Sequence, residues 1–473
     1  MTANIIGLSI LLLAVALVVG KIIRVKFKIF SKFFMPTSII SGFLLLFFGP
    51  EVLGAFAGRF DIETLEYGLF TPEILQVFSS LPGLLITIIF AGLFLGKRLP
   101  SAKNIWLTAG PQVSYGQTAA WGQYVFGILI TMILLTPVFG APPMAGALIE
   151  IAFEGGHGTA SGLASTFEDV GYAEGGDLAV GLATVGVLSG VIFGVLLINW
   201  GVRKQHTHTL KSKDALDTQS MSGIIDKDKR EKTMAMTVSP ESIEPLALHL
   251  GIIAIAVLLG IGILEALVFI ENVTWNASGN MTIFGYVPLF PVAMLGGVIV
   301  QRVLDRFDTF DIIDREMIAR IQGLALDILI VSSIASLSLT VIGENIAIFL
   351  ILSFTGILWN LIAFIYLAPK MIPKYWFERG IGDFGQSMAM TPVGLMLLRI
   401  GDPHNQTRAL EAFGYKQLLF EPIVGGGLMT ALSVPLIFQF GPLPVFIFSL
   451  IIMIIWMMIG IFYFGKKDPD TIE

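Results

Sequence analysis

The chain has 473 residues, of which 55% are hydrophobic and only 14% are charged. Soluble domains carry roughly 25% charged residues, so this composition excludes an ordinary soluble protein and predicts an all-α polytopic membrane protein. The sequence contains no cysteine, which excludes disulfides, thiolate metal ligands and cysteine nucleophiles.

Apolar runs of about 20 residues are long enough to cross a bilayer as helices, and they predict about eleven transmembrane spans here. The spans are expected at about 4–23, 35–53, 74–96, 105–138, 176–200, 246–270, 283–300, 318–341, 344–368, 413–438 and 443–464. Clusters of Lys and Arg follow the first and third spans, and Lys466 and Lys467 follow the last. The positive-inside rule then predicts an N-terminus outside the cell and a cytoplasmic central linker and C-terminus.

The hydrophobic sequence is interrupted in the segment 143–170. An apolar run there ends at Phe153 and is followed by Glu154-Gly155-Gly156-His157-Gly158-Thr159-Ala160. Glycines weaken a helix and permit close backbone approach, and backbone groups freed inside a bilayer must face protein, water or a ligand. Glu150 and Glu154 share a helix face, and carboxylates at membrane depth are candidates for function. The segment therefore predicts a broken, re-entrant binding element, with a tightly packed kink as the alternative.

A second interruption lies at 380–400, where Gly380, Gly382, Gly385 and Thr391-Pro392 break another apolar region. Each half of the chain then has five spans with a break between the fourth and the fifth. An odd number of spans inverts the second repeat relative to the first, as in many secondary transporters. The predicted organisation is a membrane repeat at 1–200, a cytoplasmic linker at 201–245, an inverted repeat at 246–438 and an extra helix with a tail at 439–473. Acidic residues offset the basic ones in the linker, so nucleic-acid binding is not expected.

The residues Gly155-Gly156-His157-Gly158-Thr159-Ala160 closely resemble the signature of the bacterial glutamate:sodium symporter family. The segment from Phe384-Gly385 to Thr391-Pro392 resembles that family's second re-entrant segment, and the resemblance extends over roughly 4–438. It implies a homodimeric transporter in the bacterial inner membrane, whose re-entrant segments meet near the membrane centre and carry an acidic amino acid with sodium. It implies no cofactor besides the sodium ion and no enzymatic activity.

The candidate site residues come from the two interruptions. The expected substrate ligands are Gly155, Gly156, His157, Gly158, Thr159, Gln386, Ser387, Thr391 and Arg399, and the expected ion ligands are Glu154, Ser161, Asp383 and Gly385. Backbone N–H groups at half-helix starts attract an anion, and unwound carbonyls suit sodium. Structural alternatives exist for several of these residues. Ser and Thr often bond to their own helix, His157 can bond to a facing carbonyl, and Asp383 can pair with Arg379.

Glu154 and Arg399 have opposite implications for the substrate. A carboxylate at 154 repels an anion unless sodium or a proton neutralises it, whereas the Arg399 guanidinium can hold a carboxylate bidentately. The sequence favours cation-coupled symport of glutamate or a related amino or carboxylic acid by alternating access, with sodium as the expected cation. A channel is the first alternative, although no filter-like repeat is present. A membrane metalloenzyme is the second, because Glu154 and His157 have a spacing used in carboxylate-bridged metal sites on continuous helices.

Overall fold

The structure, a computed structural model, describes residues 2–32, 35–97, 102–210, 235–276, 282–403 and 406–466. Every regular element within these ranges is a helix, as the composition predicted. The helices of the first half are α1 (Ala3–Lys26), α2 (Lys28–Lys32), α3 (Thr37–Phe48), α4 (Ala55–Gly58), α5 (Pro72–Ala91), α6 (Ala102–Ile130), α7 (Thr136–Phe139), α8 (Leu148–Phe153), α9 (Gly156–Gly162), α10 (Ala164–Asp169) and α11 (Glu174–Arg203). Those of the second half are α13 (Pro245–Val273), α14 (Leu289–Phe307), α15 (Arg315–Ala335), α16 (Leu339–Glu344), α17 (Ile346–Ile362), α18 (Ala368–Met371), α19 (Trp376–Gly401), α20 (Ala409–Phe420), α21 (Leu428–Phe440) and α22 (Pro442–Met458).

Short helical segments of other types join several of these helices. The π-helical segments are Pro50–Gly54, Thr131–Leu135, Ala363–Leu367 and Ile459–Phe464, and the 3-10 segments are Glu63–Leu65, Pro143–Ala147 and Phe284–Tyr286. Residues 211–234 of the predicted linker lie outside the described part of the chain, as does Lys467.

Nine helices in the described part of the chain are long and apolar enough to cross a membrane. They are Ala3–Lys26, Thr37–Gly58, Pro72–Ala91, Thr108–Phe139, Glu174–Arg203, Pro245–Val273, Arg315–Ala335, Ile346–Met371 and Pro442–Phe464. The span predicted at 283–300 corresponds to α14, which begins after Pro288 and falls outside this set. Its last two turns carry Arg302, Asp305 and Arg306, so its C-terminal end is too polar for a simple hydrophobic span.

The prediction of one continuous span over 413–438 is wrong. Helix α20 ends at Phe420 and α21 begins at Leu428. Between them Gly425 and Gly426 have φ angles of +71° and +99°, which a right-handed helix does not contain. The chain therefore has a further break at 421–427, in a region whose hydropathy resembles that of a single span.

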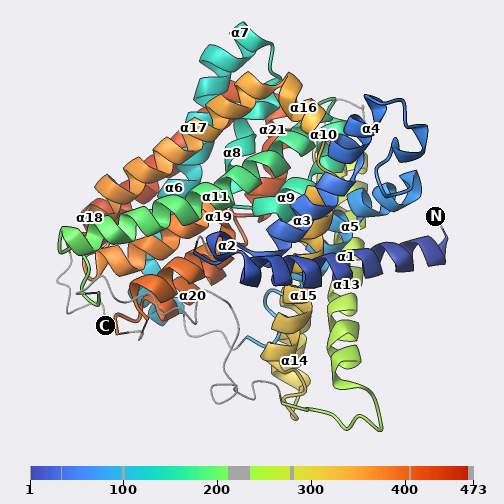
Figure 1. The fold of residues 1–473 in the computed structure, drawn as a ribbon. Helices are drawn as coiled ribbons and strands as arrows, with labels where there is room; N and C mark the ends of the chain where they lie inside the picture. The colour runs from blue at the N-terminus through green and yellow to red at the C-terminus, as the bar shows by residue number, and fades with distance from the viewer. Residues whose placement is uncertain are drawn as a thin grey trace.

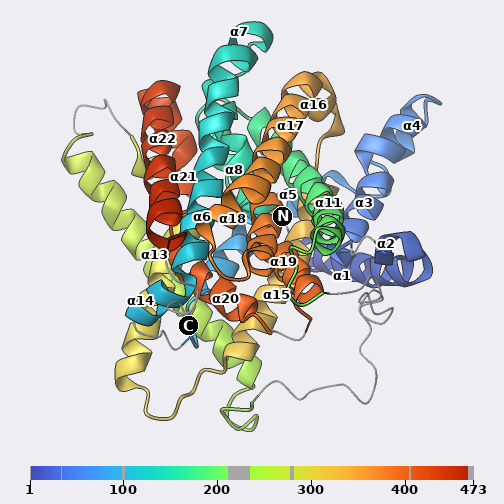
Figure 2. The same cartoon turned by 90° about the vertical axis from the view of Figure 1, so that its left-hand side faces the viewer.

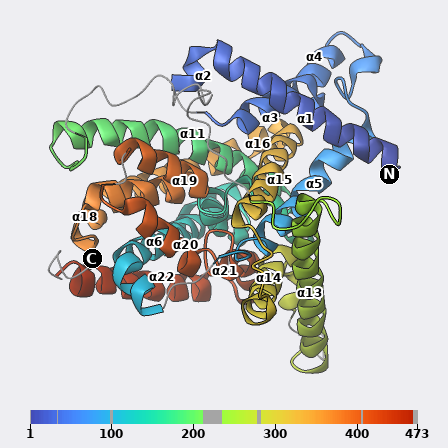
Figure 3. The ribbon, with the colours of Figure 1, turned by 90° about the horizontal axis from the view of Figure 1, so that it is seen from below.

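The helices form two groups, which lie on opposite sides of the molecule in Figures 1 and 3. The frame group comprises α1, α3, α5 and α13–α15, and the hairpin group comprises α6, α8–α11, α17 and α19–α22. Within the frame group α5 packs on α14 and α15, while α15 packs on α3 and α5. Within the hairpin group α6 contacts α17, α20 and α22, as Figure 2 also shows. Helix α9 belongs to the hairpin group but packs on both α5 and α15, so it lies at the boundary.

Two hairpins give the hairpin group its name. The first hairpin (143–169) enters through α8, breaks after Phe153 and returns through α9 and α10. The second hairpin (376–401) is α19 itself, which is interrupted at Ala389 and Met390. A Cβ on Gly385 would lie 2.9 Å from the Cα atom of Gly394. A continuous helix would separate residues nine positions apart by about 13 Å, so the two arms of α19 run back along each other.

Met390 has a strained backbone at the tip of the second hairpin. Its φ and ψ are 66° and 170°, a region that glycine occupies almost exclusively. A non-glycine residue there costs about 1–3 kcal/mol, so the surrounding packing must hold the tip in place.

Candidate functional site

The tips of the two hairpins touch each other inside the molecule. Gly156 has a φ of +70°, and a Cβ at this position would lie 2.9 Å from the Met390 Sδ atom. Both residues are buried. The two interruptions predicted from the sequence are therefore neighbours in space, although they are more than 200 residues apart in the chain.

The break at 421–427 joins the two tips and forms the third part of the site. The backbone N–H of Gly425 donates to Glu150 Oε1 over 2.9 Å, and the Thr430 hydroxyl donates to the same oxygen over 2.8 Å. The Tyr124 hydroxyl donates to the other oxygen, Oε2. Three donors thus satisfy the buried Glu150 carboxylate, which fixes α8 against α6 and the third break.

Glu154 is a second buried carboxylate, and the three donors to Glu150 do not bond to it. It is 2% exposed, and neither of its oxygens has a hydrogen-bond partner among the described residues. The Ser387 hydroxyl and the Lys416 ammonium lie near enough to interact favourably with it, but outside hydrogen-bond geometry. A buried carboxylate without donors is costly at membrane depth, so Glu154 is a candidate for binding a cation.

Asp383 pairs with Lys416, a partner that the sequence did not suggest. The Lys416 Nζ lies 3.2 Å from Asp383 Oδ1, and both side chains are fully buried. Lys416 also donates to the Gln386 Oε1 over 2.7 Å. The expected alternative partner, Arg379, lies four residues earlier on α19, acts electrostatically on Asp383 as well and also lines a polar pocket with Glu411. Two predicted ligands, Asp383 and Gln386, thus hold one ammonium group.

The C-terminal end of the first arm of α19 is held by amide side chains. The Ser387 carbonyl accepts from Gln123 Nε2 over 2.7 Å and from Asn360 Nδ2 over 2.9 Å. The Ser387 hydroxyl is buried, meets no hydrogen-bond criterion with a described residue and lies near the Glu154 carboxylate. Amides from α6 and α17 therefore fix the end of this arm.

Thr391 begins the second arm of α19 and contacts the third break. Its hydroxyl donates to Glu421 Oε1 over 2.9 Å and accepts from Gln417 Nε2 over 2.6 Å. Gln417 also donates to Glu421. This triad ties the second hairpin to α20, and it already uses the hydroxyl that the sequence predicted as a substrate ligand.

The polar residues of α9 have specific partners. His157 Nε2 lies 3.0 Å from the Thr184 hydroxyl, and its Nδ1 has no partner in the part of the chain described. The Thr184 hydroxyl can donate to the Val180 carbonyl, so Nε2 carries the proton and Nδ1 is a buried acceptor. The Thr159 hydroxyl bonds back to the Gly155 carbonyl over 3.0 Å, as Thr often does in a helix.

Ser161 faces the frame group. Its hydroxyl donates to the Ser333 hydroxyl of α15 over 2.7 Å. Ser333 in turn donates to the Leu329 carbonyl, so the Ser161 oxygen keeps its lone pairs for a ligand.

The remaining predicted residues divide into glycines that pack and an arginine outside the site. A Cβ on Gly155 would meet the Ile151 carbonyl at 2.6 Å, and one on Gly158 would meet Ile86 Cδ1 at 2.6 Å. Gly385 is close to Gly394 between the arms of α19. Arg399 is exposed and lies about 13 Å further along the second arm than Met390, so it is not brought to the tips.

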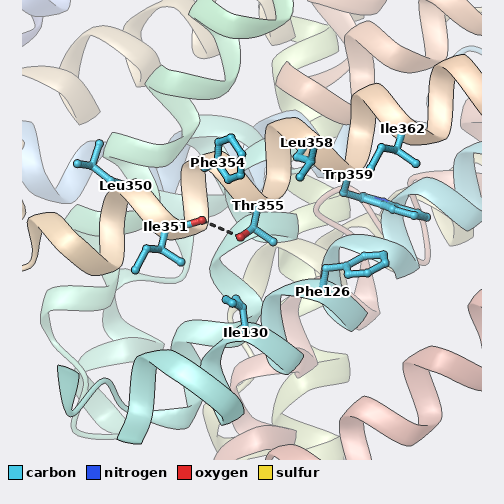
Figure 4. Close-up of a pocket in the computed structure, with 9 residues that line it drawn as sticks. All are labelled: Phe126, Ile130, Leu350, Ile351, Phe354, Thr355, Leu358, Trp359 and Ile362. Atoms are coloured by element: carbon cyan, nitrogen blue, oxygen red, sulfur yellow. Dashed lines mark hydrogen bonds between the residues drawn. The ribbon is translucent and has the colours of Figure 1, made fainter. Parts of the chain in front are cut away.

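An apolar groove between α6 and α17 encloses about 440 Å³ but lacks the chemistry for a charged substrate (Figure 4). It is lined by Phe126, Ile130, Leu350, Ile351, Phe354, Thr355, Leu358, Trp359 and Ile362. The one hydroxyl among them, on Thr355, donates to the Ile351 carbonyl over 2.7 Å. The Trp359 indole N–H donates to the Ala119 carbonyl over 2.8 Å. The groove offers no free polar side chain.

The metal-site alternative finds no support in the described residues. No three His, Asp or Glu side chains among them are grouped closely enough to hold a metal ion. Glu154 and His157 are separated by the break, and His157 points to Thr184.

Sequence reasoning missed Lys416 and the break at 421–427. The break at 421–427 had a visible signal in the sequence, because Gly425-Gly426-Gly427 is a glycine cluster like the one at 155–158. Lys416 gave no comparable signal. A single lysine at one end of an apolar run ordinarily indicates where a transmembrane helix reaches the membrane surface.

Comparison with known proteins agrees with the family resemblance. The family model described as sodium/glutamate symporter matches residues 4–375, which include the first hairpin and all nine candidate spans but the last. The matched range ends just before α19. The sequence matches no individual curated protein. Because the matched residues make up well over half of the sequence, the chain belongs to the sodium/glutamate symporter family.

Proposed function

We propose that this protein is a secondary active transporter that takes up glutamate, or a related amino or carboxylic acid, together with sodium by alternating access. The observation that carries the proposal is the meeting of three helix breaks around the buried Glu154 carboxylate, whose oxygens accept no hydrogen bond within the described ranges. Membership of the sodium/glutamate symporter family supports sodium as the coupling ion and glutamate as the substrate class. Irregular backbone at membrane depth is tolerated where it lines a site, which supports a binding role for these breaks.

In this proposal Glu154 binds the coupling sodium. Neither carboxylate oxygen accepts a hydrogen bond from the residues that the structure describes, and oxygen ligands are what an alkali cation requires. The Ser161 hydroxyl, with its free lone pairs, is a second proposed sodium ligand at the boundary between the groups. Sodium on Glu154 removes a negative charge from the site, so an anionic substrate can then enter without repulsion.

The acid binds between the tips of the hairpins. The second arms begin at Gly156 and Thr391, and their first backbone N–H groups provide positive dipole for a carboxylate. The Ser387 hydroxyl is a donor for the substrate, and His157 Nδ1 is an acceptor suited to an ammonium group. Arg399 has no part in this arrangement, because it is exposed and distant from the tips.

The division into two groups supports alternating access. The frame and hairpin groups meet at α9, which packs on α5 and α15. The reciprocal packing of α5 on α14 and of α15 on α3 is what two inverted repeats related by a two-fold axis would produce. From the family resemblance we further propose a homodimer in the bacterial inner membrane, with the N-terminus outside and residues 201–245 and the C-terminus in the cytoplasm.

Uptake of radiolabelled acids into proteoliposomes tests the proposal. Glutamate, aspartate and dicarboxylic acids without an amino group would be offered under inward sodium, potassium or proton gradients. Saturable glutamate uptake that requires an inward sodium gradient is the expected result. Uptake at equal rates in both directions without any cation gradient would refute the symport mechanism, and conductance that does not saturate with substrate would favour a channel.

A further inference from the structure

The Lys416 ammonium lies in a site whose other groups are suited to a free cation. Lys416, on α20, is fully buried, with its Nζ 3.2 Å from Asp383 Oδ1 and 2.7 Å from Gln386 Oε1. The ammonium also lies 4.0 Å from the ring centroid of Phe420. A carboxylate, an amide carbonyl and an aromatic face are together the groups that bind monovalent cations in proteins.

The packing around the lysine holds the ammonium in this place. A Cβ on Gly116 of α6 would lie 2.5 Å from the Lys416 Cε and 2.7 Å from its Nζ, so the side chain fills the space that this glycine leaves. Lys416 forms an ion pair with Asp383, and Arg379, four residues earlier on α19, also acts electrostatically on this carboxylate. If Lys416 were removed, the buried carboxylate would lose the counterion that forms an ion pair with it, which is strongly unfavourable unless another cation takes its place.

We propose that Lys416 is a tethered cation that permanently occupies this site, so that Asp383 does not bind sodium in this protein. Of the ionised groups Glu154, Asp383 and Lys416, the lysine balances one carboxylate and leaves one negative charge. One sodium on Glu154 then neutralises these three groups, while the neighbouring Glu150 carboxylate is stabilised by its own three hydrogen-bond donors. The inference rests on the proposed function and deepens it, because it limits the cluster between the hairpins to a single coupling sodium. Whether sodium can bind at Asp383 can be measured without any transport.

Thermal unfolding of the purified full-length protein in sodium, potassium or choline chloride tests the site directly. Lys416→Met should unfold at lower temperature than the wild type in choline, and sodium should restore it in a saturable manner beyond the effect that sodium has on the wild type. The double variant Lys416→Met/Asp383→Asn has no carboxylate at position 383 and should lack this additional sodium effect. Lys204→Met, at an exposed position after α11, controls for the loss of a positive charge.

The outcomes separate the inference from its rivals. An additional sodium effect in Lys416→Met that disappears in the double variant supports the tethered cation. The same sodium dependence in Lys416→Met and in the wild type would overturn it. The proposal would also be overturned if Lys416→Met folded in none of the three salts while the double variant folded, because the site would then not accept a free cation.

Sodium dependence of glutamate uptake provides a second measurement. The Hill coefficient for sodium should rise in Lys416→Met relative to the wild type, as a second ion joins the cluster. If the wild type shows no sodium-dependent uptake at all, the proposed transport function fails. The unfolding experiment still tests whether Lys416 occupies a cation site.

Discussion

Replacing Gly156 with alanine tests whether the contact between the two hairpin tips is needed for transport. The φ of +70° means that any side chain costs about 1–2 kcal/mol at this position. In addition, the new Cβ would lie 2.9 Å from Met390 Sδ and 3.3 Å from its Cβ and Cγ, so Met390 must move. Gly171 has a φ of +75° and no described atom within 4 Å of its Cβ position, so Gly171→Ala carries the backbone cost alone and is the matched control.

Both variants should lose about 1–2 kcal/mol of unfolding free energy, and Gly156→Ala should lose about 1–3 kcal/mol more from overpacking against Met390. Uptake should fall strongly for Gly156→Ala and stay near the wild-type rate for Gly171→Ala. Gly156→Val should insert into the membrane but not transport, because a branched side chain cannot fit. Met390→Ala combined with Gly156→Ala should restore part of both losses. Unfolding in detergent and uptake into proteoliposomes measure the two effects. Equal stability and equal uptake for the two alanine variants would refute the reasoning.

Further predictions concern the polar groups of the site. Glu154→Gln should fold but show a weakened sodium dependence or a shifted pH profile of uptake; unchanged ion and pH dependence would make the carboxylate structural. Ser161→Ala should raise the sodium concentration for half-maximal uptake more than Ser333→Ala does, and equal effects would mean that the hydroxyl pair only packs. Glu150→Gln should destabilise the protein by about 1–3 kcal/mol in denaturant unfolding, because an amide N–H₂ then faces a donor. Arg399→Gln should leave the KM for glutamate unchanged, and a large rise in KM would show that this arginine contributes to substrate binding.

The sequence was sufficient for features that depend on local chemistry. The breaks at Gly155-Gly156 and near Met390 were predictable, because glycines and polar residues interrupt apolar runs at both places. The break at 421–427 was missed because the averaged hydropathy of its flanks hid the glycine cluster. Averaging over about 20 residues gives the length of an apolar run but not its backbone conformation.

Contacts between distant segments could not be predicted from one sequence. The pairing of Ser161 with Ser333 joins residues that are 172 positions apart, and nothing in either local sequence selects the partner. The pairing of Asp383 with Lys416 likewise depends on how α20 packs on α19. Asp383 was predicted as an ion ligand, and its pairing with Lys416 could be found only from the fold.

Close backbone contacts in the frame group restrict which sequences can build this protein. A Cβ on Gly296 would lie 2.1 Å from the Ala256 carbonyl oxygen, and one on Gly297 would lie 2.2 Å from that of Ala91. These neighbours are main-chain atoms, so no change of rotamer can make room, and alanine at either position would push two helices apart. At the boundary between the groups, Gly158 faces the movable end of the Ile86 side chain instead. Sequence drift is therefore expected to be tolerated at the boundary, while at Gly296 and Gly297 even one added methyl group should prevent the helices from assembling.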